Sequence, residues 1–241
     1  MTLINSLPED IIIDCISRVP KRYYQTLSLV SKYFRSLITS HELFARRSLL
    51  NRTEYCLYVT ISNKSDNNDG DDDRLYTLRQ NFNSPDKKYS LVPVTSLPRI
   101  PPHSSYVAVD SKIFVIPDDD KSLASTDTLL IDCRFHTAHH LPNMPNEVAV
   151  DVRQICVEDV KGVRLITDED ANVSCTVIYG EKVVVFLQIE ICEKNEIWCV
   201  EIKVEKDQKG ELCGRVEWCG CLLEGHWAAG PDLKDALVVK V

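Results

Sequence analysis

The chain has 241 residues, of which 44% are hydrophobic and 27% are charged, a composition typical of globular proteins. It carries 28 Lys and Arg against 36 Asp and Glu, and the net charge of −8 argues against a general nucleic-acid-binding protein, which would present a basic surface. No apolar stretch approaches the roughly 18 residues of a membrane-spanning helix. The first residues contain neither a basic region nor a long apolar segment, so we expect no secretory signal and a cytoplasmic or nuclear protein.

Ten cysteines need an assignment. They stand at positions 15, 56, 133, 156, 175, 192, 199, 213, 219 and 221. Several lie inside apolar stretches such as residues 198–200. Because no secretory signal is predicted, we expect reduced thiols that mostly serve as small apolar core residues, rather than a disulfide framework.

The first fifty residues contain no glycine and their pattern predicts short helices. Ser6 is a candidate N-cap, Glu9 completes a capping box, and Pro8 fits the first helical turn, while Pro20 ends the helix. Apolar residues recur at helical spacing in three groups: Ile11, Ile12, Cys15, Ile16 and Val19; Leu27, Val30, Phe34 and Leu37; and Leu43, Phe44 and Leu49. Fifty residues are too few to bury faces this broad, so we expect a second domain or another protein to cover part of them.

These helices resemble an F-box domain. The resemblance rests on residues 7–12 (LPEDII), 15–20 (CISRVP) and 27–38 (LSLVSKYFRSLI), and residues 40–44 (SHELF) match the usual end of the motif. Phe34 departs from the pattern, because the family often has Trp there, but it keeps an aromatic side chain. Helical periodicity alone would also fit a plain helical subdomain packed on the rest of the chain; the motif separates the two interpretations.

The resemblance implies a partner. An F-box docks on the Skp-type adaptor of an SCF ubiquitin ligase, and the adaptor in turn sits on a cullin scaffold with a RING subunit. The residues of this chain that match the docking motif are Leu7, Pro8, Ile11, Ile12, Ile16, Leu27, Val30 and Phe34. The sequence leaves open which of them contact the adaptor and which fill the core of the F-box itself.

Residues 51–102 are expected to form a linker with an acidic loop and edge strands. Residues 62–73 contain no apolar side chain, so this loop is expected to be solvated. A calcium loop centred on Gly70 would place Ser65 and Tyr76 where Asp and Glu are needed, so the sequence does not favour one. The apolar stretches at 75–78 and 89–94, followed by several prolines, indicate edge strands.

From about residue 104 the apolar period becomes that of β-strands. The runs 106–109 and 113–116, joined by residues 110–112, predict a hairpin whose two faces are both apolar and therefore both covered. Further strands are predicted at residues 128–133, 154–157, 174–179, 183–187 and 195–202.

Part of this region resembles the kelch repeat, which forms one blade of a β-propeller. The resemblance lies in residues 130–137 (LIDCRFHT) with Leu141-Pro142, and again in residues 195–202 (NEIWCVEI) with 214–218 (GRVEW). An F-box followed by such a blade resembles the plant-type F-box/kelch-repeat family. The implied organisation is α+β and multidomain: a three-helix F-box (1–50), the linker (51–102), a kelch-like repeat (103–146) and a degenerate kelch-like terminal β region (147–241).

The kelch pattern is incomplete. Pro117-Asp118 stand where a blade normally has two glycines, and Ala138 stands where a Trp normally packs between blades. Residues 103–241 amount to fewer than three repeats of about 50 residues, whereas a closed propeller has about four to eight blades. We therefore expect antiparallel sheets in a partial, unclosed propeller whose exposed edges invite aggregation or a partner.

Two Cys/His clusters have spacings near those of zinc ligands. They comprise Cys133, His136, His139 and His140, and Cys213, Cys219, Cys221 and His226. The kelch resemblance already explains the first cluster as a strand and its turn, and the second lacks a C-x-x-C pair. We expect no metal, no cofactor and no catalytic residue.

These observations predict a non-enzymatic adaptor that recruits a protein substrate through its β region while its F-box docks on the Skp-type subunit. Tethering would raise the effective concentration of the target near the ligase. One alternative is an F-box protein that binds the adaptor without delivering a substrate. Another is a small metal-binding β protein built on the Cys/His clusters. No residue of a substrate-binding site can be named from the sequence.

Overall fold

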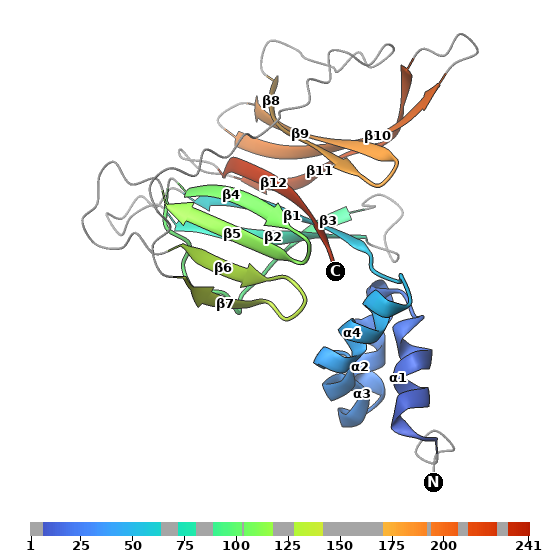
Figure 1. Cartoon of the computed structure of the whole chain (residues 1–241). Coiled ribbons are helices and arrows are strands. Elements are labelled where there is room, and N and C mark those ends of the chain that lie inside the picture. The colour runs from blue at the N-terminus through green and yellow to red at the C-terminus, as the bar shows by residue number, and fades with distance from the viewer. Residues whose placement is uncertain are drawn as a thin grey trace.

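The computed structural model describes residues 7–63, 72–80, 89–102, 104–117, 128–141, 171–191, 194–206, 212–225 and 231–241 (Figure 1). The helices are α1 (Glu9–Ser17), the 3-10 helix η2 (Lys21–Tyr23), α2 (Tyr24–Val30), α3 (Lys32–Leu37) and α4 (His41–Leu49). The strands that follow form only antiparallel pairs. The predicted class, a small helical F-box followed by antiparallel sheets, is confirmed.

Two serine caps divide the helical region. The apolar pattern through 27–37 suggested one continuous helix, but Ser31 is extended (φ −161°, ψ 164°) and separates α2 from α3. Its hydroxyl accepts a hydrogen bond from the Phe34 amide at 3.2 Å, which satisfies one of the free donors at the start of α3. Ser40 caps α4 in the same way through the Leu43 amide. Pro8 occupies the N-cap position of α1 without a side-chain cap, and the predicted cap Ser6 lies outside the described residues.

The strands form three four-stranded sheets. The first sheet has the order β12 (Asp232–Lys240), β1 (Tyr55–Asn63), β2 (Asp72–Gln80), β3 (Tyr89–Pro93). The second sheet has the order β4 (Ser104–Val109), β5 (Lys112–Pro117), β6 (Leu129–Asp132), β7 (Thr137–His140). The third sheet has the order β11 (Leu212–Gly225), β10 (Lys194–Lys206), β9 (Lys182–Ile191), β8 (Ala171–Tyr179).

The first sheet joins the two ends of the β region. Its strand β12 is the last strand of the chain and pairs with β1 from Tyr55↔Lys240 to Ser62↔Asp232. The pairing continues at Glu54 and Val241, which exchange two backbone hydrogen bonds of 2.7 and 2.8 Å. Residues 51–102, expected to be a linker with edge strands, thus supply three strands of a regular sheet. The sequence did not reveal this role because the completing strand lies far away along the chain.

The sheets follow one another like adjacent propeller blades. β12 lies beside both β4 and β8, while β4 and β8 share no comparable contact among the described residues. The first sheet is therefore flanked by the second and the third, and the strands that the structure describes do not close into a ring (Figure 1). This arrangement fits the predicted partial kelch-like region. The expected hairpin at 106–116 is confirmed as β4 and β5, whereas the strand expected at 154–157 lies outside the described residues.

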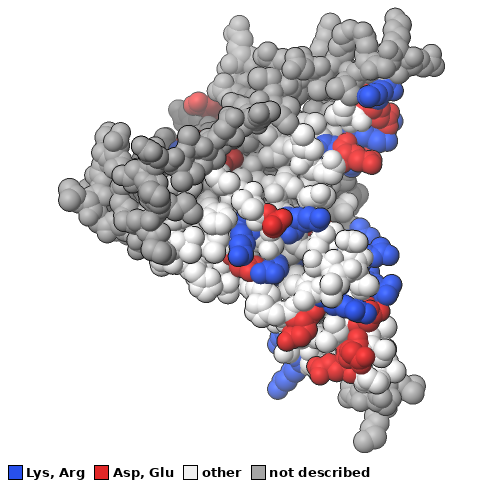
Figure 2. Space-filling model, viewed as in Figure 1, with Lys and Arg blue, Asp and Glu red and all other residues white. Residues whose placement is uncertain are grey.

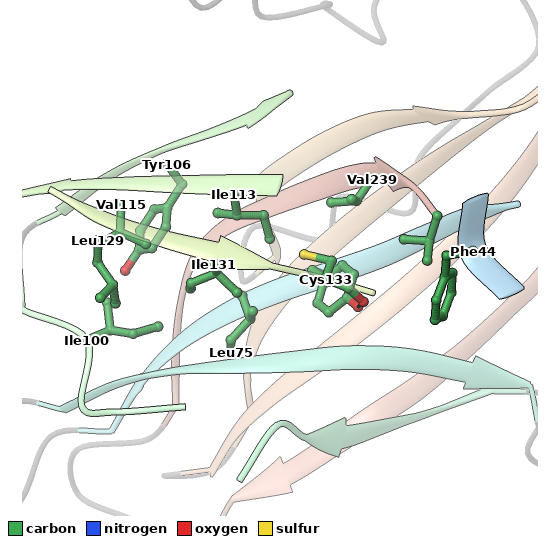
Figure 3. Packing of buried hydrophobic residues seen from close by; sticks show 12 residues of the cluster. Phe44, Leu75, Ile100, Tyr106, Ile113, Val115, Leu129, Ile131, Cys133 and Val239 are labelled. Atoms are coloured by element: carbon green, nitrogen blue, oxygen red, sulfur yellow. Dashed lines mark hydrogen bonds between the residues drawn. The ribbon is translucent and has the colours of Figure 1, made fainter. Parts of the chain in front are cut away.

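Two apolar clusters hold this row of sheets together. Side chains of β1 alternate between them: Tyr58 faces the second sheet, whereas Leu57 and Val59 face the third. Figure 3 shows the first cluster, in which Ile131 of the second sheet lies over Leu75 of the first and Phe44 of α4 closes one end. Since Phe44 belongs to the apolar cluster shared by the first two sheets, the helical region packs directly on the sheets.

Candidate functional site

The residues that match the F-box docking motif divide into two groups in the structure. Ile12, Ile16 and Phe34 are 6–8% exposed and point into the helical region. There they form one cluster with Tyr24, Leu37 and Leu43. These three motif residues therefore build the F-box core and are not available at the surface.

The other motif residues lie at the surface. Leu7 is 47%, Ile11 45% and Val30 63% exposed. Pro8 is also exposed, and Leu27 is half-buried at the edge of the core.

Three exposed apolar side chains of the same helices were missed by sequence reasoning. They are Leu29 (79% exposed), Tyr23 (45%) and Tyr33 (38%). Leu29 directly precedes Val30, and the break at Ser31 turns this end of α2 outward. The helix break that exposes Leu29 could have been found in the sequence, because Ser31 is a recognisable N-cap residue. The apolar period, however, runs through that position without interruption.

The first turn of α1 lies near α3. The pKa of Tyr33 is raised by desolvation and, in second place, by the Glu9 carboxylate of that turn. We call the exposed apolar side chains of this region the apolar F-box surface and define it as Leu7, Pro8, Ile11, Leu29, Val30 and Tyr33. In Figure 2 uncharged side chains occupy much of the helical region, bordered by charges of both signs. Large exposed apolar patches on a protein surface are typical of protein-binding sites.

A buried arginine fixes the helices to the sheets. Arg47 of α4 is 1% exposed, and its guanidinium donates to the carbonyl oxygens of Ser17 (3.2 Å) and Val19 (2.8 Å) and to the Tyr24 hydroxyl (3.0 Å). The same side chain pairs with Glu54 at 2.6 Å. Arg47 thus ties three helical segments to the residue that precedes β1.

Glu54 is the centre of this junction. Its carboxylate also accepts the Lys21 amide at 2.9 Å, while its backbone pairs with Val241. The helices, the first strand and the last residue of the chain therefore meet at one position. This geometry fixes the orientation of the apolar F-box surface relative to the β region.

Aromatic contacts reinforce the junction on the side of the second sheet. Phe135, in the turn between β6 and β7, lies 4.2 Å from the ring of His41 and 5.2 Å from that of Phe44, measured between centroids. Phe135 belongs to the stretch that resembles a kelch repeat. In this chain the stretch helps to seat α4.

A surface ion pair joins the first and last helices. Asp14 of α1 accepts hydrogen bonds from Arg46 of α4 and from Arg18, and these contacts lower the pKa of the Asp14 carboxyl. All three side chains are partly exposed, so the pairing contributes little stability.

The first Cys/His cluster is part of the β core. Cys133 is buried, and burial raises the pKa of its thiol to about 12. The Tyr58 hydroxyl lies 2.8 Å from His136 Nε2 and 3.2 Å from the Cys133 carbonyl oxygen. Burial, followed by the charges of Lys21 and Arg79, lowers the pKa of His136 to about 4. His136 is therefore a neutral structural side chain between the first two sheets.

The remaining cluster members are not assembled into a metal site where the structure describes them. His139 and His140 are successive residues of β7 and so project from opposite faces of the second sheet. Cys219 is exposed and Cys221 half-buried, whereas the side chain of Cys213 and all of His226 lie outside the described residues. In the described part of the chain no three or more Cys, His, Asp or Glu side chains lie close enough to hold an ion.

A membrane-spanning helix is likewise absent from the residues that the structure describes.

Comparison with known proteins supports both resemblances, to the F-box domain and to the F-box/kelch-repeat proteins. The F-box domain family matches residues 4–46. Three relatives are named F-box/kelch-repeat proteins and come from Arabidopsis thaliana. One is 29% identical over 93% of this chain and 92% of its own length. Two others are 43% and 40% identical over 57% and 58% of this chain. No solved structure matches.

The alignments also show that this chain is short for its relatives. It spans 36% and 38% of the second and third relatives. The first alignment runs over 347 positions, which exceeds the 241 residues of the chain by 106, so at least that many aligned positions have no residue here. That difference corresponds to about two kelch repeats of about 50 residues.

Proposed function

We propose that this chain, which carries an F-box domain and is homologous to the F-box/kelch-repeat proteins of Arabidopsis thaliana, is a non-catalytic substrate-recruiting subunit of an SCF-type ubiquitin ligase. Its F-box binds a Skp-type adaptor and, through the adaptor, the cullin and RING subunits. Its β region binds a target protein.

The observation that carries the proposal is the apolar F-box surface. Its exposed members alternate along α1 and α2 with residues that fill the helical core, so Ile11 is free to contact a partner while Ile12 is not. The proposed docking residues are Leu7, Pro8, Ile11 and Val30 from the motif, together with Leu29 and Tyr33. The half-buried Leu27 contributes at the margin, and Ile12, Ile16 and Phe34 support the surface from beneath.

The junction at Arg47 and Glu54 explains how the two regions could act together in substrate recruitment. Because the helices are fixed on the sheets, a target bound to the β region is held at a set orientation to the ligase. Tethering of this kind raises the effective concentration of the target and makes ubiquitin transfer nearly intramolecular. The chemistry of the transfer belongs to the other subunits.

The test is binding of the purified chain to a Skp-type adaptor after co-expression, followed by size-exclusion chromatography. We expect a one-to-one complex. Ile11→Asp and Val30→Asp should each weaken binding by about 30-fold or more, because charging the centre of an interface removes about 2 kcal/mol. Their circular dichroism spectra should match that of the wild type, since both side chains are exposed.

Two further variants keep the test specific. Leu49→Asp charges a more exposed side chain of α4 outside the apolar F-box surface (76% exposed) and should leave adaptor binding unchanged. Phe34→Ala removes a core side chain, so its main effect should be a lower melting temperature. If Ile11→Asp and Val30→Asp bind the adaptor as well as the wild type does, the proposed docking surface is wrong.

A second function is favoured by the missing repeats: the chain could bind the adaptor without delivering a target. At least 106 aligned positions are absent relative to one full-length relative, and these would belong to the recognition region. Limited proteolysis of the adaptor complex distinguishes the two functions. A β region that resists cleavage supports substrate recruitment, whereas rapid loss of everything after α4 supports the second function.

A further inference from the structure

We propose that the first two sheets hold a divalent cation of the Ca²⁺ class at one end of their shared cluster, between the strands β1, β2, β4 and β12. The ligands are oxygen atoms of Thr60, Asp73 and Asp235, and Tyr106 positions Asp73. We call these four residues the interior polar cluster. The proposal is independent of the proposed ligase function, because every residue of the cluster belongs to a strand and none to the apolar F-box surface.

The strand register places the polar side chains of the first sheet on one face. Thr60 follows Tyr58 by two positions in β1 and therefore faces the second sheet as Tyr58 does. Asp235 of β12 lies directly opposite Thr60. Thr60 also lies opposite Leu75 of β2, so Asp73, two positions before Leu75, is a diagonal neighbour of Thr60 on the same face.

Tyr106 completes the cluster from the second sheet. Its hydroxyl donates a hydrogen bond to Asp73 Oδ2 at 2.9 Å. Figure 3 shows Tyr106 at the end of the apolar cluster that lies opposite Phe44. Burial, followed by the charges of Asp73 and Asp235, raises the pKa of Tyr106, which agrees with both carboxylates lying within electrostatic range of its hydroxyl. The cluster therefore joins four strands of two sheets.

Two polar atoms of the cluster have no partner. Asp73 is 2% exposed and Thr60 is 0% exposed, so neither side chain can turn to solvent. Asp73 Oδ1 and Thr60 Oγ1 are buried and form no hydrogen bond. Leaving a buried polar atom unpaired costs free energy, and in native proteins such atoms normally bind an ordered water molecule or an ion.

The charge of the cluster favours a cation over water. In the described part of the chain no Lys, Arg or His forms an ion pair with Asp73 or Asp235. Their carboxylates accept hydrogen bonds only from neutral groups, the Tyr106 hydroxyl and the Ala236 amide (2.7 Å). Burial also raises the pKa of Asp235 to about 6. A water molecule would leave both buried negative charges uncompensated, whereas one divalent cation balances both.

The ligand atoms favour Ca²⁺ among the divalent cations. All of them are carboxylate or hydroxyl oxygens, which hard cations prefer, and the cluster contains no Cys or His that would select zinc. Ca²⁺ accepts six to eight oxygen ligands in a flexible geometry, whereas Mg²⁺ requires a near-ideal octahedron. The pairing of β1 with β12 also shifts register between Thr60 and Ile61, and a bulge of this kind leaves backbone groups unpaired beside the cluster.

A cation at this position would fasten the strand that completes the first sheet. Asp235 lies on β12, while Thr60 and Asp73 lie on β1 and β2. The cluster forms only when these strands are paired, so the cation binds the folded β region and not the unfolded chain. Binding of this kind stabilises the folded state by mass action.

The experiment uses the full chain, freed of bound metal with EGTA. Thermal unfolding is followed by circular dichroism in EGTA and in millimolar Ca²⁺, and isothermal titration calorimetry measures Ca²⁺ binding to the folded protein. We expect Ca²⁺ to raise the melting temperature by about 5 °C or more. We also expect one Ca²⁺ per chain and a smaller shift with Mg²⁺ at the same concentration.

Four variants locate the site. Asp73→Asn and Asp235→Asn keep the size of the side chain, remove its charge and should each abolish the Ca²⁺-dependent shift. Tyr106→Phe removes the hydroxyl that positions Asp73 and should weaken Ca²⁺ binding by about 10-fold or more in the titration, a readout that a loss of stability alone would not change. Asp110→Asn is the matched control: its position is exposed, asparagine tolerates the left-handed backbone there (φ 51°), and the shift should remain.

A wild-type chain whose melting temperature is the same in EGTA and in Ca²⁺, with no heat of binding, would overturn the proposal and would mean that protons keep these carboxyl groups neutral. A full Ca²⁺ shift in both aspartate variants would also overturn it and would assign the binding to other acidic residues. Because Asp235 is less buried than Asp73, Asp235→Asn decides the question if Asp73→Asn does not fold. Adaptor binding is measured in EGTA and in Ca²⁺ on the same samples, so failure of the cation site and failure of the proposed ligase function are told apart.

Discussion

The helical region and the β region of this protein are built on different length scales. The helical core assembles from side chains between Ile12 and Leu43, with caps at Ser31 and Ser40 that act three residues along the chain. The first sheet depends on β12, which pairs with β1 across most of the sequence. The helical core can therefore be formed by local sequence, whereas the first sheet is formed only when the two ends of the β region meet.

The two regions are nevertheless coupled. Phe44 belongs to the core shared by the first two sheets, and Glu54 links Arg47, Lys21 and Val241 at one point. A substitution in β12 should therefore also change the stability of the helices, and a substitution in α4 should change the stability of the sheets. The following predictions test how far this coupling extends.

The largest effect is expected for Val239→Asp. Val239 is fully buried between the first and second sheets and pairs with Cys56, so an aspartate there would place a charge in the core. The expected loss in the free energy of unfolding exceeds about 4 kcal/mol, a large share of the stability of an ordinary domain. Thermal unfolding by circular dichroism measures the change, with the exposed neighbour variant Lys240→Gln as the control. A Val239→Asp protein that melts at the wild-type temperature would show that β12 does not hold the β region together.

Arg47→Ala should have the next largest effect. The substitution leaves the carbonyl oxygens of Ser17 and Val19 without their buried donor and removes the pairing with Glu54. We expect a loss of about 2–4 kcal/mol. Arg46→Ala, at the adjacent exposed position, should cost less than about 1 kcal/mol. Chemical denaturation of both variants gives the comparison, and equal effects would mean that the buried network does not anchor the helices.

The smallest predicted effect is a pH dependence due to His136. Its pKa is about 4 in the folded protein and about 6.5 when unfolded, because burial disfavours the charged ring. As the pH falls from 6.5 to 4, the unfolded chain takes up a proton that the folded protein does not. The stability contribution is therefore fully present above pH 6.5 and is lost toward pH 4, by at most about 3 kcal/mol.

His136→Asn isolates this effect, because asparagine tolerates the left-handed backbone at this position (φ 54°) and does not titrate. The variant should show a flatter dependence of unfolding free energy on pH between 7 and 4.5 than the wild type. Asp235, whose pKa is raised to about 6 by burial, contributes with the opposite sign in both proteins and cancels in the difference. His139→Asn, at an exposed position, is the control; a wild-type slope in His136→Asn would contradict the assignment.

The F-box was predictable from sequence because its information is local. The motif residues, the end of α1 near Pro20 and the cap at Ser40 all act within a few positions along the chain. The division of the motif into core and surface was not predictable, since Ile11 and Ile12 are equally apolar and only helix packing decides which one is buried. The burial of Arg47 was not predictable either, because an arginine in a helix is normally expected at the surface.

In the β region the sequence predicted strands but not their partners. The hairpin of β4 and β5 could be identified because its turn is short, and strands were also predicted where β9 and β10 lie. The sequence predicts a linker at 51–102, whereas the structure places three strands of the first sheet there. No local pattern records their pairing with β12. Two Cys/His clusters suggested zinc by spacing alone, whereas the fold places His136 against Tyr58 and separates His139 from His140 by the alternation of one strand.

The sequence by itself indicated the F-box, the antiparallel character of the β region and the shortage of repeats, the first two through motifs that resemble known families and the last through length. Only the tertiary structure decided which apolar residues remain exposed on the F-box, that Arg47 and Glu54 fix it to the sheets, and that β12 completes the first sheet. These properties depend on how the helices pack on one another and on the sheets, and a pattern within a single element does not record that packing.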